Sequence, residues 1–216
     1  MQTDGIYGNL PRDLGLVNLS PDEMMAWLYC PIKRPGAIIV TIPENLTQYM
    51  PIINAVVSDI DPDTWTDSYV YITAKTLFVS PENPGNRPGW HSDGFLTDDL
   101  NYIWADANPT VFWYPETGKA SFAADHQLSI PEMDGLCEHD TAGHVTYPLK
   151  HLLKLDQTVL HKVAPVTTPG MRTFVKVSVS KHVYALKGNS INHRLKLRAA
   201  YGTRAVERNC PTGVMV

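Results

Sequence analysis

The sequence has little charge, few cysteines and no long apolar run. Only 19% of the residues are charged and acidic residues outnumber basic ones by 22 to 18, which argues against binding nucleic acid through overall charge. The three cysteines, Cys30, Cys137 and Cys210, are widely spaced, so a secreted disulfide framework is not expected. No stretch approaches the roughly 18 apolar residues of a membrane span, and no secretory signal opens the chain. The sequence therefore predicts a soluble, cytoplasmic protein with no membrane partner.

What is present indicates a folded, β-rich chain. The 216 residues are 44% hydrophobic, which is enough for a substantial core, and the length favours a single domain over residues 1–216. The 17 prolines and 14 glycines imply many turns and few long helices. We expect a mainly β fold.

Helical signals are confined to three short stretches. Ser20, Pro21 and Glu23 form a capping pattern that predicts a short helix. It would run through Trp27 and Leu28 and be stopped by Pro31 and Pro35. Apolar residues recur at helical spacing over residues 46–57, where Pro51 is expected to end or kink the helix. A further short helix is predicted within residues 147–155.

Strand signals dominate the rest of the chain. Runs rich in β-branched and aromatic residues, separated by Pro, Gly, Asn and Asp, predict strands. These are residues 69–79, 100–105, 110–114, 120–124, 158–163, 173–180 and 193–201. Several short strands at this spacing are typical of a sandwich, jelly roll or small barrel.

One short motif carries the strongest chemical signal. In an extended strand His91 and Asp93 point to the same face, so an imidazole and a carboxylate would lie side by side. His161, inside the predicted strand 158–163, is the candidate for a third ligand. Two histidines and one carboxylate on one side of a metal leave positions open for a cosubstrate and O2, as in non-haem Fe(II) oxygenases.

Arg172 follows eleven residues after His161, at the start of the next predicted strand. If strands 158–163 and 173–180 pair through the turn between them, the guanidinium returns near the metal ligands. There its planar fork could bind a carboxylate bidentately.

The pattern His91, Asp93, His161 and Arg172 resembles the Fe(II)- and 2-oxoglutarate-dependent oxygenases with a double-stranded β-helix core. Their motif is His-x-Asp, a His after roughly 50 to 80 residues, and an Arg about ten residues later that binds 2-oxoglutarate. The resemblance covers approximately residues 69–180. It implies a jelly roll with one or two flanking N-terminal helices.

The same resemblance implies cofactors and roles. Fe(II) would be held by His91, Asp93 and His161, and 2-oxoglutarate by Arg172, with Tyr102 as a further candidate for binding its carboxylate. O2 would be the oxidant, and the reaction would hydroxylate or oxidatively demethylate a substrate C–H bond while releasing succinate and CO2. Tyr102 is equally compatible with a plain core aromatic.

Two alternatives and the substrate stay open at this level. A cupin-like metalloenzyme could use the same three ligands without 2-oxoglutarate, and a noncatalytic β-sandwich binding module could carry His91 and Asp93 as loop residues. A small molecule is favoured as substrate over a nucleobase or a protein side chain. The sequence does not indicate an oligomeric state.

Two other segments have weaker signals. Residues 137–144 contain Cys137, His139 and His144, but their spacing suits neither a strand nor a helix face, so a lid over the site or a plain surface loop is favoured over a metal site. In the predicted strand 193–201, Arg194, Lys196 and Arg198 would form a basic stripe. That stripe suits a solvated edge strand or an anionic partner.

Overall fold

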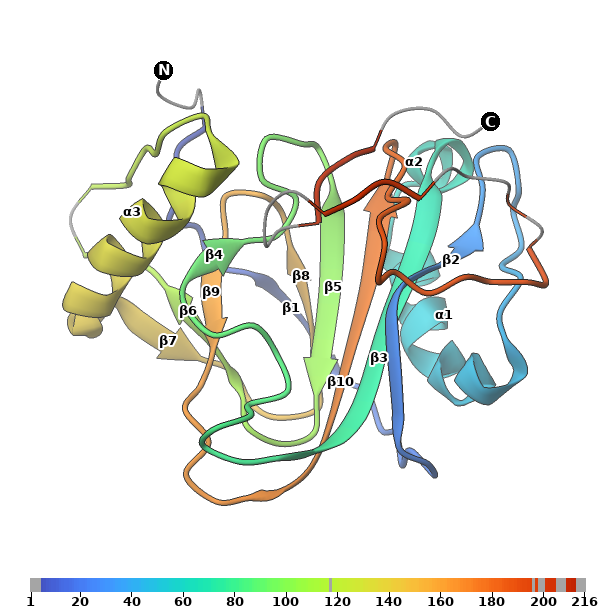
Figure 1. Ribbon diagram of the computed structural model, residues 1–216, viewed down its shortest axis with the longest axis horizontal. Coiled ribbons are helices and arrows are strands. Elements are labelled where there is room, and N and C mark those ends of the chain that lie inside the picture. The colour runs from blue at the N-terminus through green and yellow to red at the C-terminus, as the bar shows by residue number, and fades with distance from the viewer. Residues whose placement is uncertain (1–4, 117, 196, 198–200, 205–208, 213–216) are drawn as a thin grey trace.

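The computed structural model describes residues 5–116, 118–195, 197, 201–204 and 209–212. Two antiparallel sheets face each other, one of six strands and one of four (Figure 1). The six-stranded sheet has the order β1 (Arg12–Leu16), β8 (His151–Leu155), β5 (Leu100–Ala105), β10 (Gly170–Ser180), β3 (Tyr69–Val79) and β2 (Met25–Lys33). The four-stranded sheet has the order β4 (His91–Ser92), β9 (Leu160–Val163), β6 (Thr110–Trp113) and β7 (His144–Thr146). The prediction of a mainly β fold is confirmed at the level of a β-sandwich.

The outer face of the six-stranded sheet is covered by helices (Figure 1). Alternate side chains of β3 and β10, such as Ile72 and Val177, pack there against the 3-10 helix Glu44–Tyr49, α1 (Met50–Asp59) and α2 (Pro62–Asp67). The opposite side chains of the same strands point toward the other sheet, because side chains alternate along a strand. The period of two therefore separates an apolar helix-facing side from a polar interior side.

The four-stranded sheet has its own helical cover. Its outer face packs against α3 (His126–His139), and the fully buried Trp90 and Met133 meet in this cluster. Between the two sheets lies a third, smaller cluster that contains Phe112 from β6 and Phe174 from β10. The order of layers is thus helices, six-stranded sheet, four-stranded sheet and α3.

Two predicted helices are wrong. Residues 25–28 belong to β2, which lies at the edge of the six-stranded sheet. An edge strand tolerates Pro31, because the missing N–H there breaks no hydrogen bond in the middle of the sheet. Residues 151–155 form β8, whose pairing with β1 and β5 overrides the weak helical spacing of the leucines. The helix expected around 46–57 exists, but Pro51 stands in the first turn of α1 and begins that helix instead of ending it.

Other expectations for the elements have mixed outcomes. Strands 69–79 and 100–105 match β3 and β5, whereas 120–124 contributes only an isolated bridge between Ala120 and Tyr7. Residues 193–195 form a turn, so the predicted strand does not begin there, and Lys196 and Arg198 of the basic stripe lie outside the described residues. No helix in the described part of the chain is both long and apolar enough to cross a membrane.

Candidate metal centre

The site begins with a pair of histidines on neighbouring strands of the four-stranded sheet. His91 of β4 lies directly opposite His161 of β9, with ring centroids 4.6 Å apart. Both strands are short and antiparallel, so residues 70 positions apart in sequence become cross-strand neighbours. Sequence reasoning predicted this meeting of His91 and His161.

Asp93 follows β4 within a turn. Its Oδ2 lies 3.6 Å from His161 Nε2, on the same side as His91, while the intervening Ser92 turns away and donates to the carbonyl of Gln157. The next residue, Gly94, has a φ of +71°, and a Cβ there would come within 2.9 Å of the Asp99 Cβ. Only glycine fits this turn without strain, and the turn presents the Asp93 carboxylate to the histidines.

The second nitrogen of each ring is occupied by the backbone. His91 Nδ1 lies 2.9 Å from the carbonyl oxygen of Gly89, and His161 Nδ1 lies 3.3 Å from that of Val159. A ring nitrogen that donates to a carbonyl oxygen carries the proton, and in the neutral ring Nε2 then keeps its lone pair for a metal. This arrangement orients metal-binding histidines in proteins.

The donor set fits a divalent transition metal. One ligand atom from each of His91, Asp93 and His161 lies within 4.8 Å of the others, so all three can approach one ion. Burial and the neighbouring His161 lower the pKa of His91 to about 3, so its ring is neutral and available as a ligand. Imidazole nitrogens with one carboxylate are the donors that Fe(II) favours in facial sites.

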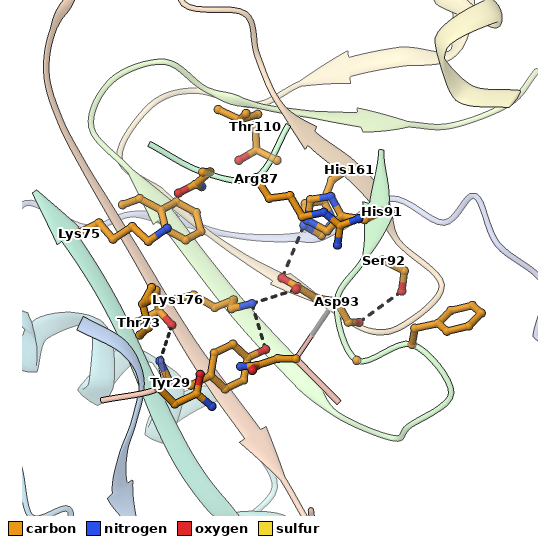
Figure 2. Close-up of a pocket in the computed structure, with 18 of the residues that line it drawn as sticks. Tyr29, Thr73, Lys75, Arg87, His91, Ser92, Asp93, Thr110, His161 and Lys176 are labelled. Atoms are coloured by element: carbon orange, nitrogen blue, oxygen red, sulfur yellow. Dashed lines mark hydrogen bonds and ion pairs between the residues drawn. The ribbon is translucent and has the colours of Figure 1, made fainter. Parts of the chain in front are cut away.

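A buried lysine holds the other oxygen of Asp93. Lys176 Nζ of β10 lies 2.9 Å from Asp93 Oδ1 and donates to the hydroxyl of Tyr29 at 3.2 Å. Burial by itself would raise the pKa of Asp93, but Lys176 and His161 outweigh it and hold that pKa well below its usual range. The carboxylate is therefore ionised and has Oδ2 turned toward the histidines (Figure 2).

These residues stand at one side of a cavity of about 340 Å³. Its polar wall includes Lys75, Arg87, Lys176 and Arg204, and Asp93 is the single carboxylate among the described lining residues. A volume of this size lies at the low end of pockets for small ligands. The surplus of positive charge favours an anionic ligand.

Helix α3 supports the site from behind. Trp90, next to His91, donates its backbone N–H to Asp134 Oδ1 at 2.9 Å and its indole N–H to Glu138 Oε2 at 2.8 Å. His126 at the start of α3 lines the cavity. Of residues 137–144, where a lid or a surface loop was expected, the first three end α3, Thr141–Gly143 form a 3-10 helix and His144 begins β7 (His144–Thr146), which pairs with β6.

Arg172 is on the interior face of β10 but not on the wall of the cavity. Its Nε donates to the carbonyl oxygens of Ala107 and Asn108 at 2.9 and 3.1 Å, and its guanidinium lies 5.2 Å from the ring centroid of Phe174. β9 and β10 belong to different sheets, so the expected pairing of these strands is wrong. The structure does not bring Arg172 beside the three candidate ligands.

Tyr102 lies on the opposite face of the six-stranded sheet. It pairs with Val177, and both side chains join the cluster that packs against the helices. Its hydroxyl donates to Asp59 Oδ2 of α1 at 2.9 Å. The structure therefore places Tyr102 in the core and does not bring it to the cavity.

The sequence interpretation missed Lys75, Lys176 and Tyr29. The signal that could have found the two lysines is a charged residue inside a run that otherwise reads as a buried strand, since Ala74 and Thr76 flank Lys75 and two valines flank Lys176. Lysine is rarely buried without a partner or a function. Tyr29 has no comparable signal.

A second group of possible ligands lies at Asp98, Asp99 and His182. Asp98 is 60% exposed and lies 3.6 Å from both Lys181 Nζ and His182 Nε2, which describes a surface ion pair. Neither of the ligand groups found among the described residues includes Cys137, His139 or His144. His144 Nε2 instead lies 2.8 Å from the carbonyl oxygen of Cys137.

Comparisons with known proteins add little to this geometry. A scan against protein-family models and a search of curated proteins found no match. Among solved structures, the "Crystal Structure of Fe(II)-HppE with alternative substrate (S)-1-HPP" aligns with a TM-score of 0.27 and 9% identity over 80% of this chain. The chain spans 63% of that protein's length. A likeness at this level carries no argument about the site.

Proposed function

We propose that this chain is a mononuclear Fe(II)-dependent oxygenase that uses 2-oxoglutarate and O2 to hydroxylate or oxidatively demethylate a small molecule. The observation that carries the proposal is the convergence of His91, Asp93 and His161 at the cavity, with both Nδ1 atoms directed to carbonyl oxygens. When bound, Fe(II) with 2-oxoglutarate would supply activation of O2 and oxidation of a C–H bond, with succinate and CO2 as coproducts.

The protein's own residues account for binding and orientation. His91 offers the Nε2 of a neutral ring, His161 offers its Nε2, and Asp93 offers an ionised oxygen that Lys176 keeps in place. Phe95, Val163 and Phe174 line the cavity with apolar surface and exclude water from part of it. The open positions on the metal would face this cavity.

The first experiment measures metal binding. Calorimetric titration of the metal-free protein with Mn(II) under anaerobic conditions should give one site per chain. Asp93→Ala and His161→Ala should weaken that site by more than about 100-fold, because loss of a ligand's outer partner alone costs about 10–100-fold. His182→Ala is the matched control, since it removes a histidine of the other ligand group and should leave Mn(II) affinity unchanged.

The second experiment measures turnover. Fe(II)-loaded protein should convert 2-oxoglutarate to succinate under air, slowly without substrate, and Asp93→Ala and His161→Ala should not. Absence of a stoichiometric metal site and of succinate would contradict the proposal and favour a noncatalytic β-sandwich binding module.

A metalloenzyme that does not use 2-oxoglutarate is the second candidate. The observation that favours it is the position of Arg172, which the oxygenase family would place at the cosubstrate carboxylate but which does not line this cavity. Mn(II)-loaded protein that fails to bind 2-oxoglutarate in a titration would support this second candidate over the first.

A further inference from the structure

We propose that Lys75 receives the free carboxylate of a ligand that chelates the metal through its other end. This inference rests on the metal site proposed above and concerns the residue that recognises the remote end of the ligand. Lys75 of β3 would thus bind the carboxylate that the sequence resemblance assigned to Arg172 of β10.

The position of Lys75 follows from the register of the six-stranded sheet. Lys75 of β3 pairs with Phe174 of β10, and Thr73 pairs with Lys176, so these four side chains share the interior face. All four line the cavity. Figure 2 shows the Lys75 side chain extending from β3 toward the side of the cavity that holds His91 and His161.

Lys75 is a largely enclosed cation without a counter-charge. None of the ion pairs found in the described part of the chain includes it, and its Nζ donates to the carbonyl oxygen of Gly85 at 2.9 Å. An ammonium group has three donors, so two are left for a ligand. Lys176 differs, because its charge is already balanced by Asp93 at 2.9 Å.

The electrostatic surroundings strengthen the need for an anion. Burial, with the nearby charges of Lys176 and Arg172, lowers the pKa of Lys75 to about 8. A carboxylate bound at Lys75 would offset both the burial and the repulsion between these cations. The cavity therefore has a place for negative charge on the β3 wall, apart from the metal ligands.

Arg172 is the natural competitor for this role. It lies two residues before Phe174 on the same face, and its Nη2 has no hydrogen-bond partner among the described residues. Its Nε is nevertheless held by two backbone carbonyls, and the side chain stays off the cavity wall while Phe174 occupies that wall. Of these two cations, Lys75 is the one that lines the cavity.

The test compares two ligands that differ only at the remote end. 2-Oxoglutarate carries a carboxylate where 2-oxopentanoate carries a methyl group, and both present the same 2-oxo acid to a metal. Calorimetric titration of the Mn(II)-loaded protein with each ligand gives their ratio of dissociation constants. The wild-type protein should prefer 2-oxoglutarate by about 10- to 100-fold, as expected for a charge-assisted hydrogen bond.

Lys75→Met should abolish this preference by weakening 2-oxoglutarate binding and leaving 2-oxopentanoate binding unchanged. Lys75→Arg, which retains the charge, should keep most of the preference. Lys154→Met serves as the matched control because Lys154 pairs with Asp59, away from the cavity, and this variant should retain the full preference. The Mn(II) dissociation constant should be the same in all four proteins.

Each other outcome has a definite meaning. An unchanged preference in Lys75→Met, or no preference in the wild-type protein, would overturn the inference while Mn(II) binding left the proposed metal site intact. Loss of the preference in Arg172→Met but not in Lys75→Met would overturn it in favour of Arg172. Failure of the wild-type protein to bind Mn(II) would instead overturn the proposed function, and the inference with it.

Discussion

Lys176 and Asp93 form a buried ion pair that joins the two sheets at the candidate metal centre. The Nζ of Lys176, on β10 of the six-stranded sheet, lies 2.9 Å from Oδ1 of Asp93, which follows β4 of the four-stranded sheet. The two side chains are 9% and 17% exposed. Burial would lower the pKa of Lys176, but Asp93 and Tyr29 raise it instead, so both members of the pair are charged. Lys176 of the six-stranded sheet therefore holds the carboxylate of Asp93, a candidate metal ligand, in its orientation.

Lys176→Met should make the metal-free protein less stable and more dependent on metal. Removing one member of a buried pair leaves the other charge uncompensated, which typically costs about 3–5 kcal/mol. A divalent ion would then replace the lost counter-charge, so the Mn(II)-induced rise in melting temperature should be larger than in the wild-type protein.

Thermal unfolding with and without Mn(II) measures both effects. Lys181→Met is the control, because Lys181 is 61% exposed and its pairing with Asp98 is at the surface. A smaller Mn(II)-induced shift in Lys176→Met than in the wild-type protein would contradict the prediction.

Gly94→Ala should damage both stability and metal affinity. A residue with a side chain at a φ of +71° costs about 1–2 kcal/mol, and the new Cβ would also press on Asp99 at 2.9 Å. Relief of this contact would move the turn that presents Asp93, so Mn(II) binding should weaken as well.

Gly15→Ala is a matched control for backbone strain alone. Gly15 has a φ of +89°, and a Cβ added there would meet no atom within 4 Å, so its substitution should lower the free energy of unfolding by about 1 kcal/mol. Urea unfolding should show a larger loss of stability for Gly94→Ala than for Gly15→Ala. Mn(II) titration should show weaker binding for Gly94→Ala alone. Equal losses of stability, with equal Mn(II) affinities, would show that the contact with Asp99 is unimportant.

Two of the three thiols should be unreactive in the folded protein. Cys30 and Cys137 are fully buried, and burial raises the pKa of each to about 12, so neither forms a thiolate near pH 8. Cys210 is only partly buried. Alkylation with iodoacetamide at pH 8, followed by mass spectrometry, should label Cys210 alone in the native protein and all three cysteines in guanidinium chloride.

The same two thiols should make the folded protein less stable as the pH rises above 9. Their folded pKa of about 12 lies above the ordinary value of 9, so the stabilisation is complete below pH 9 and is lost as the pH rises toward 12. Rapid native labelling of Cys30 or Cys137 at pH 8 would contradict both statements.

Lys33 should make the protein more stable as the pH rises, which is the opposite of the effect of the two buried thiols. Its fully buried ammonium donates to the carbonyl oxygens of Ser68, Arg34 and Thr66, and burial lowers its pKa from 10.5 to about 8. Between these values the unfolded chain binds more protons than the folded one, so stability should rise with pH in this window.

Urea unfolding between pH 7.5 and 10.5 tests this with Lys33→Met as the comparison. The free energy of unfolding of the wild-type protein should rise relative to that of the variant as the pH increases. Parallel curves for the two proteins would show that Lys33 titrates in the folded state as it does in the unfolded chain.

Part of the candidate site could be predicted because it depends on local geometry. His91 and Asp93 share a side since they are two residues apart in extended chain, and the strand character of residues around His161 was visible in its neighbours. His161 was predicted as the third ligand from its place in a predicted strand and from the resemblance, and the pairing of β4 with β9 places it opposite His91. The position of Arg172 depends on which sheet β10 joins, and that of Tyr102 on which face of β5 points to the helices. No local sequence pattern specifies either.

The misassigned elements have the same physical origin. Residues 25–28 have helical spacing, yet pairing with β3 makes them a strand, because hydrogen bonds and burial gained from a neighbouring strand exceed a weak local preference. The sequence by itself determined a β-rich chain, the alternation that divides β3 and β10 into two faces, and the candidate ligands. Only the tertiary structure decided that Lys176 meets Asp93 and that Lys75 faces the cavity, because those contacts arise from the packing of two sheets whose strands are distant in sequence.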